Sequence, residues 1–263
     1  MNSNSTSHYT FGDSDLAAQR LERLAEAYAE STTGFLREFC PRCVSVAVDL
    51  GSGLGLTTKL LQTATGSPTV IGYERSPHYL QAARGRFPEL TFRDVDVVAP
   101  EFPDRDIDLI YSRFLLTHLH EPEKAVARSV AHLKRGGRLL LEETSDLRST
   151  INCLQTYYRL VGELQTYYGQ ELYVGTRIHT MAEGTGGCVV SAHQTSLTIR
   201  AQTMASLHAM NIATWKGDSF MRSSYGTSFL DAFESELGTI AASTDVLPPV
   251  TCVMAQVVVE REV

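Results

Sequence analysis

A short glycine-rich stretch constrains this chain more than any other feature. The apolar run Val46-Ala-Val-Asp-Leu50 is followed by the glycines Gly51, Gly53 and Gly55, and then by residues 56–61, which can open a helix. This order predicts a strand, a tight turn and a helix N-terminus, where glycine permits positive φ and a close approach of ligand. A dinucleotide fingerprint needs Gly-x-Gly-x-x-Gly, and position 56 is leucine. The stretch therefore fits less well with a pyrophosphate cradle.

At these residues the chain resembles the class I S-adenosylmethionine-dependent methyltransferases, of the small-molecule, UbiE-like type. Their first motif reads hydrophobic-Asp-hydrophobic-Gly-x-Gly-x-Gly, and residues 48–55 match it in full. The resemblance implies an α/β fold with a doubly wound, seven-stranded, mostly parallel Rossmann-like sheet and a helical lid insertion. It also implies S-adenosylmethionine as cofactor, with S-adenosylhomocysteine as product. Asp49, Gly51, Gly53 and Gly55 are then expected to bind the cofactor.

The next strand ends in an acid. Residues 69–74 are apolar up to Glu74, and Ser76-Pro77 can start the helix that follows. A carboxylate at the carboxyl end of the second strand can accept hydrogen bonds from both ribose hydroxyls of an adenosine. The family uses such an acid in this way, so Glu74, with Arg75 beside it, is expected to bind the cofactor.

The third predicted strand holds two acids that compete for one role. Residues 90–97 read as this strand and contain Asp94 and Asp96. In the family an acid at this place hydrogen-bonds the adenine amino group. The spacing to the next strand favours Asp96, with Val97 beside the adenine ring, and Asp94 is the alternative.

The fourth strand and its following loop, residues 106–114, resemble the family's fourth motif, which a short helix follows. The resemblance places Ser112, Arg113 and Phe114 beside the sulfonium or its ribose. We assign the first two to the cofactor and Phe114 to the substrate. His118 comes just after, and it is either a packing residue or a catalytic base.

A helix over residues 122–133 is predicted to end at Gly136-Gly137, with glycine at its C-cap. The fifth strand follows over residues 138–144. Acids at its carboxyl end face the ligand cleft in this topology, so Glu142 and Glu143 could orient a substrate. The alternative is that both are solvated.

Tyrosine is crowded in a predicted helical insertion after the fifth strand. An insertion there projects over the carboxyl edge of the sheet, where ligands bind. Tyrosine offers flat apolar area and a hydroxyl group, which suits a roof over an organic substrate. We therefore take Tyr157, Tyr168 and Arg177 as substrate-binding candidates and His179 as a second candidate base. Alternatively, the tyrosines pack the insertion against the domain or against a second subunit.

The domain organisation follows from these patterns. It comprises an N-terminal helical arm or lid (1–40), the cofactor-binding Rossmann-like core (41–145), the helical substrate-lid insertion (146–185) and the C-terminal part of the core sheet (186–263). Tyr28, on the apolar side of the N-terminal helix, is a substrate-binding candidate, although that helix could equally be a packing helix. Residues 188–200 and 250–260 fit the family's sixth and seventh strands, the last one antiparallel between its neighbours.

Charge and composition exclude several partners. The formal net charge of the 263 residues is −7, without a run of Lys and Arg longer than a pair, which argues against a nucleic-acid substrate. Cys40 and Cys43 have C-x-x-C spacing but neither a second pair nor a nearby histidine, so no metal is expected. No apolar stretch approaches the ~20 residues that span a bilayer, and the N-terminus lacks a secretory signal. We therefore expect a cytoplasmic protein without a membrane partner, and a homodimer is compatible with the sequence.

The sequence thus predicts an enzyme, a methyltransferase of the class EC 2.1.1.-. It would move a methyl group from S-adenosylmethionine to an O, N or C atom of a small organic molecule, for example in secondary metabolism. Two alternatives remain. The first is a protein that binds S-adenosylmethionine and guides a non-methylating rearrangement, because the binding residues would be the same. The second is an NAD-dependent oxidoreductase, against which the glycine spacing speaks.

Overall fold

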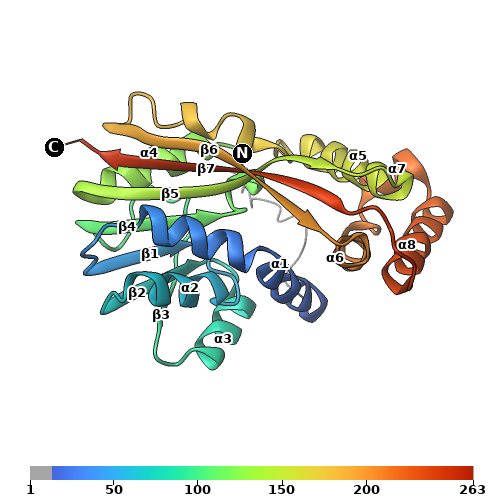
Figure 1. Cartoon of the computed structure of the whole chain (residues 1–263), viewed down its shortest axis with the longest axis horizontal. Helices are drawn as coiled ribbons and strands as arrows, with labels where there is room; N and C mark the ends of the chain where they lie inside the picture. Colours follow the sequence, from blue (N-terminus) through green and yellow to red (C-terminus); the bar gives the residue numbers. More distant parts are fainter. Residues whose placement is uncertain (1–13, 263) are drawn as a thin grey trace, which may run out of the picture.

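One mixed sheet forms the centre of the protein. The computed structural model describes residues 14–262. Its strands are β1 (Val46–Leu50), β2 (Thr69–Glu74), β3 (Thr91–Asp94), β4 (Ile107–Arg113), β5 (Leu133–Arg148), β6 (Gly187–Ile199) and β7 (Val250–Arg261). They lie in the order β3-β2-β1-β4-β5-β7-β6 (Figure 1). β1 to β5 pair in parallel, whereas β7 runs antiparallel between β5 and β6. The predicted seven-stranded, mostly parallel α/β sheet is confirmed.

Helices cover both faces of the sheet. They are α1 (Asp15–Phe39), α2 (Leu56–Thr65), α3 (Pro77–Arg86), α4 (Pro122–His132), α5 (Asn152–Tyr167), α6 (Ala201–Trp215), α7 (Ser219–Tyr225) and α8 (Thr227–Ala242), with short 3-10 helices η1 (Leu116–His118), η2 (Val174–Thr176) and η3 (Ile178–Thr180). Successive strand residues point to opposite faces. Ala47 and Leu109 therefore pack with α1, α2 and α3, whereas Val48 and Ile110 pack with α4. Burial on both faces explains why these strands read as continuous apolar runs.

The helices α5, α6, α7 and α8 gather beyond the carboxyl end of β5 (Figure 1). They share one apolar core with the start of β7 and with Tyr28 of α1. β5 continues to Arg148, so α5, η2 and η3 occupy the remainder of the segment 146–185. The helical group is completed by α6, α7 and α8, which come after β6 in the chain. Two segments far apart in the sequence therefore build one layer over the ligand-binding edge of the sheet.

Two element boundaries differ from the sequence prediction. β3 ends at Asp94 because Asp96 starts a turn: its carboxylate accepts from the Val98 N–H at 3.0 Å and its carbonyl from the Ala99 N–H at 2.9 Å. The expected glycine C-cap of α4 is also wrong. α4 ends at His132, and Gly136-Gly137 lies within β5, where pairing with β4 shifts register.

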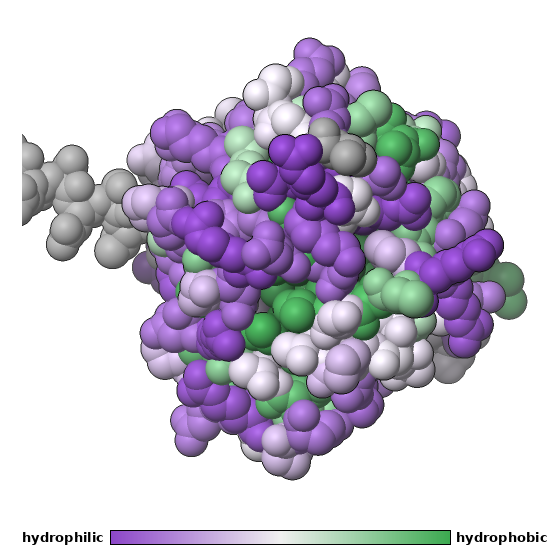
Figure 2. Space-filling view, turned by 90° about the vertical axis from the view of Figure 1, so that its left-hand side faces the viewer, coloured by the Kyte–Doolittle hydropathy of each residue, from purple (hydrophilic) through white to green (hydrophobic). Residues whose placement is uncertain are grey.

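The molecular surface at the end that carries the C-terminus is mostly hydrophilic, with small separate hydrophobic areas (Figure 2). Within residues 14–262, no helix is long and apolar enough to cross a membrane.

Candidate cofactor and substrate site

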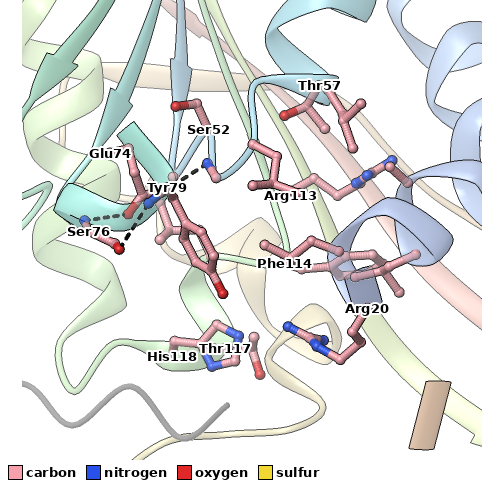
Figure 3. A pocket seen from close by; sticks show the side chains of 18 of the residues that line it. Arg20, Ser52, Thr57, Glu74, Ser76, Tyr79, Arg113, Phe114, Thr117 and His118 are labelled. Carbon is pink, nitrogen blue, oxygen red and sulfur yellow. Dashed lines mark hydrogen bonds between the residues drawn. The ribbon is translucent and has the colours of Figure 1, made fainter. Parts of the chain in front are cut away.

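A cavity of about 540 Å³ lies at the carboxyl ends of the parallel strands. It is lined by the loop after β1, the ends of β2 and β4, and side chains of α1, α5 and α6 (Figure 3). Crevices at this edge of a doubly wound sheet are the usual ligand sites of such folds. The cavity has two ends of different construction, one next to the glycine loop and one beneath the helices.

The glycine loop forms the wall of the first end. Gly51 and Gly53 line the cavity with φ of 65° and 51°, conformations that favour glycine. A Cβ atom on Gly51 would lie 2.9 Å from Leu115 Cδ1, so the Leu115 side chain would have to shift to admit it. Gly55 does not line the cavity; it precedes α2 at φ 77° and faces the Phe92 ring, where a Cβ would come within 2.6 Å. At Gly51 and Gly53 the loop thus offers bare backbone to a ligand.

Glu74 lies at the end of β2 on the same side of the cavity. Its Oε2 accepts from the Gly53 N–H at 2.9 Å, and its Oε1 accepts from the Arg75 and Ser76 N–H groups at 2.8 Å. Burial raises the pKa of this carboxyl, and the three N–H donors oppose the rise. A carboxylate has about four lone-pair sites, so one remains for a ligand hydroxyl. With its present partners Glu74 therefore has room for one of the two ribose hydroxyls that it is expected to bind.

The adenine-side residues follow directly after β3. Asp96 and Val97 line the cavity, and Asp96 lies 3.6 Å from the Arg75 guanidinium, which also lines it. Asp94 is exposed and lies outside the cavity. Of the two competing acids, the structure thus brings Asp96 to the site.

Two residues assigned to the cofactor, Asp49 and Ser112, do not line the cavity. Asp49 is buried, and its Oδ2 accepts from the hydroxyls of Thr57 and Thr58, both at 2.7 Å. Burial raises its pKa to about 6. It therefore fixes the start of α2 against β1. Ser112 is fully buried in β4 and also lies outside the lining, in contrast to Arg113.

The loop after β4 brings Phe114 into the cavity in a strained conformation. Its φ of 55° is unusual for a bulky residue, and such outliers concentrate at functional sites. Its N–H donates to the Glu142 carbonyl at 3.1 Å, and its ring meets Tyr28 edge-on with centroids 5.0 Å apart. Tyr28 also lines the cavity. These two substrate candidates therefore touch each other at the site.

Glu142 and Glu143 are buried, so the alternative that both are solvated is wrong, and neither lines the cavity. Glu143 Oε1 accepts from the Leu115 and Leu116 N–H groups at 2.9 and 2.7 Å, which fastens the loop of Phe114. Burial raises the Glu143 pKa to about 8. Glu142 accepts from the Tyr111 hydroxyl at 2.5 Å. These acids are buried parts of the frame under the site.

The second end of the cavity is formed by helices. His118 and Tyr157 line it, together with His208 and Asn211 of α6. The His208 ring stacks on Tyr157 with centroids 3.8 Å apart, and the Tyr157 hydroxyl accepts from Asn211 Nδ2 at 2.8 Å. Burial, and then the charge of Arg20, lower the pKa of both His118 and His208 to about 3. Both imidazoles are therefore neutral, weak bases near pH 7.

Three predicted site residues lie elsewhere. Tyr168 donates its hydroxyl to Asp218 Oδ2 at 2.5 Å, Arg177 pairs with Glu171 at 2.7 Å, and His179 is exposed in η3. None of the three lines the cavity. The chain after α5 passes along β5 at η2, where a Cβ on Gly175 would lie 2.6 Å from the Thr144 carbonyl. This course carries the segment past the cavity.

Sequence reasoning missed several lining residues. Arg20 is the first of them: an arginine in a helix is usually solvated, yet this one is only 5% exposed and lines the cavity. Its spacing of four and eight residues from Leu24 and Tyr28 was the available signal. Thr117, Gln165, Met204 and Asn211 also line the cavity. The residues of α6 carried no local signal, because they come more than a hundred residues after the glycine loop.

No group of three or more His, Cys, Asp or Glu side chains in the described part of the chain could hold a metal ion. The five cysteines are free thiols.

Comparison with known proteins adds to this geometry. The model of the methyltransferase domain family matches residues 48–141. Residues 48–141 are thus similar to a methyltransferase domain. The matched range of this domain begins in β1 and ends in β5, and it contains the glycine loop, Glu74, Asp96 and Arg113.

The matches to related proteins span only part of this chain and part of each relative. Trans-aconitate 2-methyltransferase of Methylobacterium radiotolerans is 35% identical over 102 residues, 39% of this chain and 39% of that protein. Demethylmenaquinone methyltransferase of Tropheryma whipplei is 34% identical over 116 residues, 43% of this chain and 46% of that protein. The chain thus matches less than half of the length of these relatives. A proposed methyltransferase from Bacillus halodurans shares the fold, with a TM-score of 0.61, 14% identity, and coverage of 89% of this chain and 100% of that one.

Proposed function

We propose that this chain transfers the methyl group of S-adenosylmethionine to a small organic molecule. One observation carries the proposal: the Glu74 carboxylate is fixed by three N–H groups beside the bare backbone of Gly51 and Gly53. A fixed acceptor next to bare backbone suits an adenosine whose ribose hydroxyls need an acceptor. The net charge of −7 favours a small molecule over a nucleic acid as the second substrate.

Bound S-adenosylmethionine would supply a methyl group that is already activated on a positive sulfur. The chain's own residues then have to orient two ligands and exclude water. Glu74 and Asp96 would hold the sugar and the base, while the apolar side chains of α1, α5 and α6 close the other end. Orientation of this kind contributes on the order of 7–11 kcal/mol to lowering a barrier.

The histidines of the cavity are poor general bases. The pKa of both His118 and His208 is lowered to about 3 by burial and then by the Arg20 charge. An efficient base has a pKa near the working pH. The cavity therefore favours an acceptor atom that is nucleophilic by itself, such as an amine or an oxygen that is already ionised.

Calorimetry with S-adenosylhomocysteine tests the cofactor assignment. The protein is first freed of carried-over ligand, and Glu74→Gln is compared with Glu89→Gln, a substitution of a half-exposed acid at the surface. We expect binding to the unchanged protein, a loss of about ten- to hundredfold in Glu74→Gln, and no change in Glu89→Gln. Tighter binding of NAD, or no heat with millimolar S-adenosylhomocysteine, would overturn the proposal.

Product analysis separates methyl transfer from a guided rearrangement. A true substrate should release one S-adenosylhomocysteine for each molecule converted. Conversion without this release would support the rearrangement instead. The cytoplasmic location, the homodimer and the lid roles of α1 and α5 stay predictions.

A further inference from the structure

Two helices each turn one stripe of side chains toward the cavity at its helical end. In α5, Tyr157, Val161 and Gln165 follow one another at intervals of four residues, and all three line the cavity. In α6, His208 and Asn211 line it three residues apart. Residues three or four apart share one face of a helix. Each stripe therefore presents one side-chain carboxamide to the cavity.

The carboxamide of Gln165 is held in one orientation. The Thr117 hydroxyl donates its single hydrogen to the Glu171 carbonyl at 2.8 Å. The Thr117 oxygen can therefore only accept from Gln165, and it does so from Nε2 at 3.4 Å. Gln165 is 0% exposed, and its Oε1 has no hydrogen-bond partner within residues 14–262. The amide nitrogen is thus used by the protein, whereas the amide oxygen is an open acceptor.

Asn211 repeats this arrangement from α6. Its Nδ2 donates to the Tyr157 hydroxyl at 2.8 Å, the residue is 7% exposed, and its Oδ1 has no partner in the described part of the chain. A buried acceptor without a donor is costly, and most such atoms in folded proteins are paired. A ligand that brings an N–H or O–H group into the cavity would remove this cost, whereas a ligand without such a group would leave both oxygens unpaired.

The surroundings of the two amides suit a planar apolar body. Tyr28 and Phe114 meet edge-on with centroids 5.0 Å apart, and both line the cavity. Pockets for small organic molecules combine such apolar walls with a few polar groups that fix the orientation of the ligand. Aliphatic and thioether side chains from α1, β5, α6 and the chain after α5 also line the cavity: Leu24, Ala25, Leu147, Leu172 and Met204.

We propose that Gln165 and Asn211 select the second ligand of this cavity, a molecule with a planar apolar body and an N–H or O–H donor. The donor binds the open amide oxygens, and the body lies against the rings of Tyr28 and Phe114. Both amides lie outside the matched range 48–141, so this selection belongs to residues that the family model does not include. The inference rests on the proposed function, because it names the substrate class of the same cavity.

Two matched pairs of aromatic probes test this inference by calorimetry on the full chain saturated with S-adenosylhomocysteine. Indole carries an N–H donor, and benzofuran has nearly the same shape without one. Phenol and fluorobenzene make the same comparison for an O–H donor. We expect the donor of at least one pair to bind about ten- to hundredfold more tightly than its donor-free partner. A difference below about tenfold in both pairs, or no binding of either donor at about 10 mM, would overturn the inference.

Variants assign the preference to the two amides. Gln165→Met and Asn211→Leu each remove one acceptor at nearly the same size, so each should lower the preference for the donor, and the double variant should abolish it. Affinity for the donor-free probe should stay the same, which a general loss of structure would not give. Gln155→Met, on an exposed position of the same helix α5, should leave the preference unchanged. A full preference in the double variant would overturn the inference.

Binding of S-adenosylhomocysteine itself separates the two possible failures. It is measured for every variant before the probes are added, and the comparison of probes on the unchanged protein does not depend on any variant. If S-adenosylhomocysteine binds and the donors are not preferred, only the inference about the substrate fails. If it does not bind to the unchanged protein, the proposed function fails first.

Discussion

The two ends of the cavity are built in different ways. At the end next to the glycine loop, backbone N–H groups and acids at strand ends lie within residues 51–97, and Glu74 accepts from the N–H groups of Gly53, Arg75 and Ser76. At the end beneath the helices, side chains from α1, α5 and α6 meet from positions as far apart as Arg20 and Asn211. Backbone geometry fixes the first end, whereas side-chain packing fixes the second. A substitution at one end should therefore change the ligand of that end and spare the other.

Gly51→Ala should give the largest loss of stability and of S-adenosylhomocysteine affinity among these variants. The new Cβ would lie 2.9 Å from Leu115 Cδ1 at a φ of 65°, so both contact and backbone are strained. We expect a loss of about 2–3 kcal/mol in the free energy of unfolding and at least a tenfold loss of S-adenosylhomocysteine affinity, measured by denaturation and calorimetry. The control is Gly136→Ala, at φ 71° with no atom within 4 Å of the new Cβ. It should cost about 1–2 kcal/mol and leave the affinity unchanged.

Glu143→Gln should change how the stability of the protein depends on pH. The buried carboxyl has a pKa of about 8 in the fold against an ordinary 4.5, so the folded state binds the proton more tightly than the unfolded state. Stability must then fall as pH rises from 4.5 to 8, by up to about 1.4 kcal/mol per pH unit. Glutamine still accepts from the Leu115 and Leu116 N–H groups but does not ionise. Melting curves should show that the variant loses less stability than the unchanged protein between pH 6 and 8; parallel losses would contradict this.

Tyr157→Phe should weaken the helical end alone. It removes the acceptor of the buried Asn211 amide, which should cost about 1–3 kcal/mol of stability. Tyr168→Phe is the matched control, because its partner Asp218 is partly exposed and the loss should stay below about 1 kcal/mol. Calorimetry should show unchanged S-adenosylhomocysteine affinity in both variants. A weakened affinity in Tyr157→Phe would mean that the two ends are coupled.

His179→Ala should have the smallest effect. The side chain is exposed and lies outside the cavity, so turnover and stability should stay within error of the unchanged protein. A loss of turnover above about tenfold would indicate that His179 takes part in catalysis.

The difference between the two ends also explains what could be predicted from sequence. The sheet was predictable because five strand–helix alternations and the glycine loop are local patterns. Glu74 and Asp96 follow directly from such patterns, since each stands at or just after the end of a strand. The roles of Asp49 and Glu143 were not predictable in the same way. The same acid types at strand ends can turn toward a helix or a loop, and only packing decides.

The residues at the helical end of the cavity could not be predicted from sequence, for a physical reason. Arginine is the residue type expected on a solvated helix face, and only the tertiary structure shows that Arg20 is buried. Tyr168 and Arg177 follow α5 in a tyrosine-rich segment that is typical of a roof, but the chain turns along β5 instead. A pattern local to one helix cannot report which other helix it meets.

The position of β7 has a consequence for how this molecule is made. β5 and β6 do not pair with each other: β7 (residues 250–261) lies between them, pairing with one edge of β5, whose other edge pairs with β4, and with β6. During synthesis, the backbone N–H and C=O groups on the β7-facing edges of β5 and β6 therefore stay unpaired until β7 leaves the ribosome. The strands β1 to β4, with the glycine loop, Glu74 and Asp96, can pair before β7 is made. The β5-β7-β6 side of the sheet can form only after residues 250–261 have been synthesised.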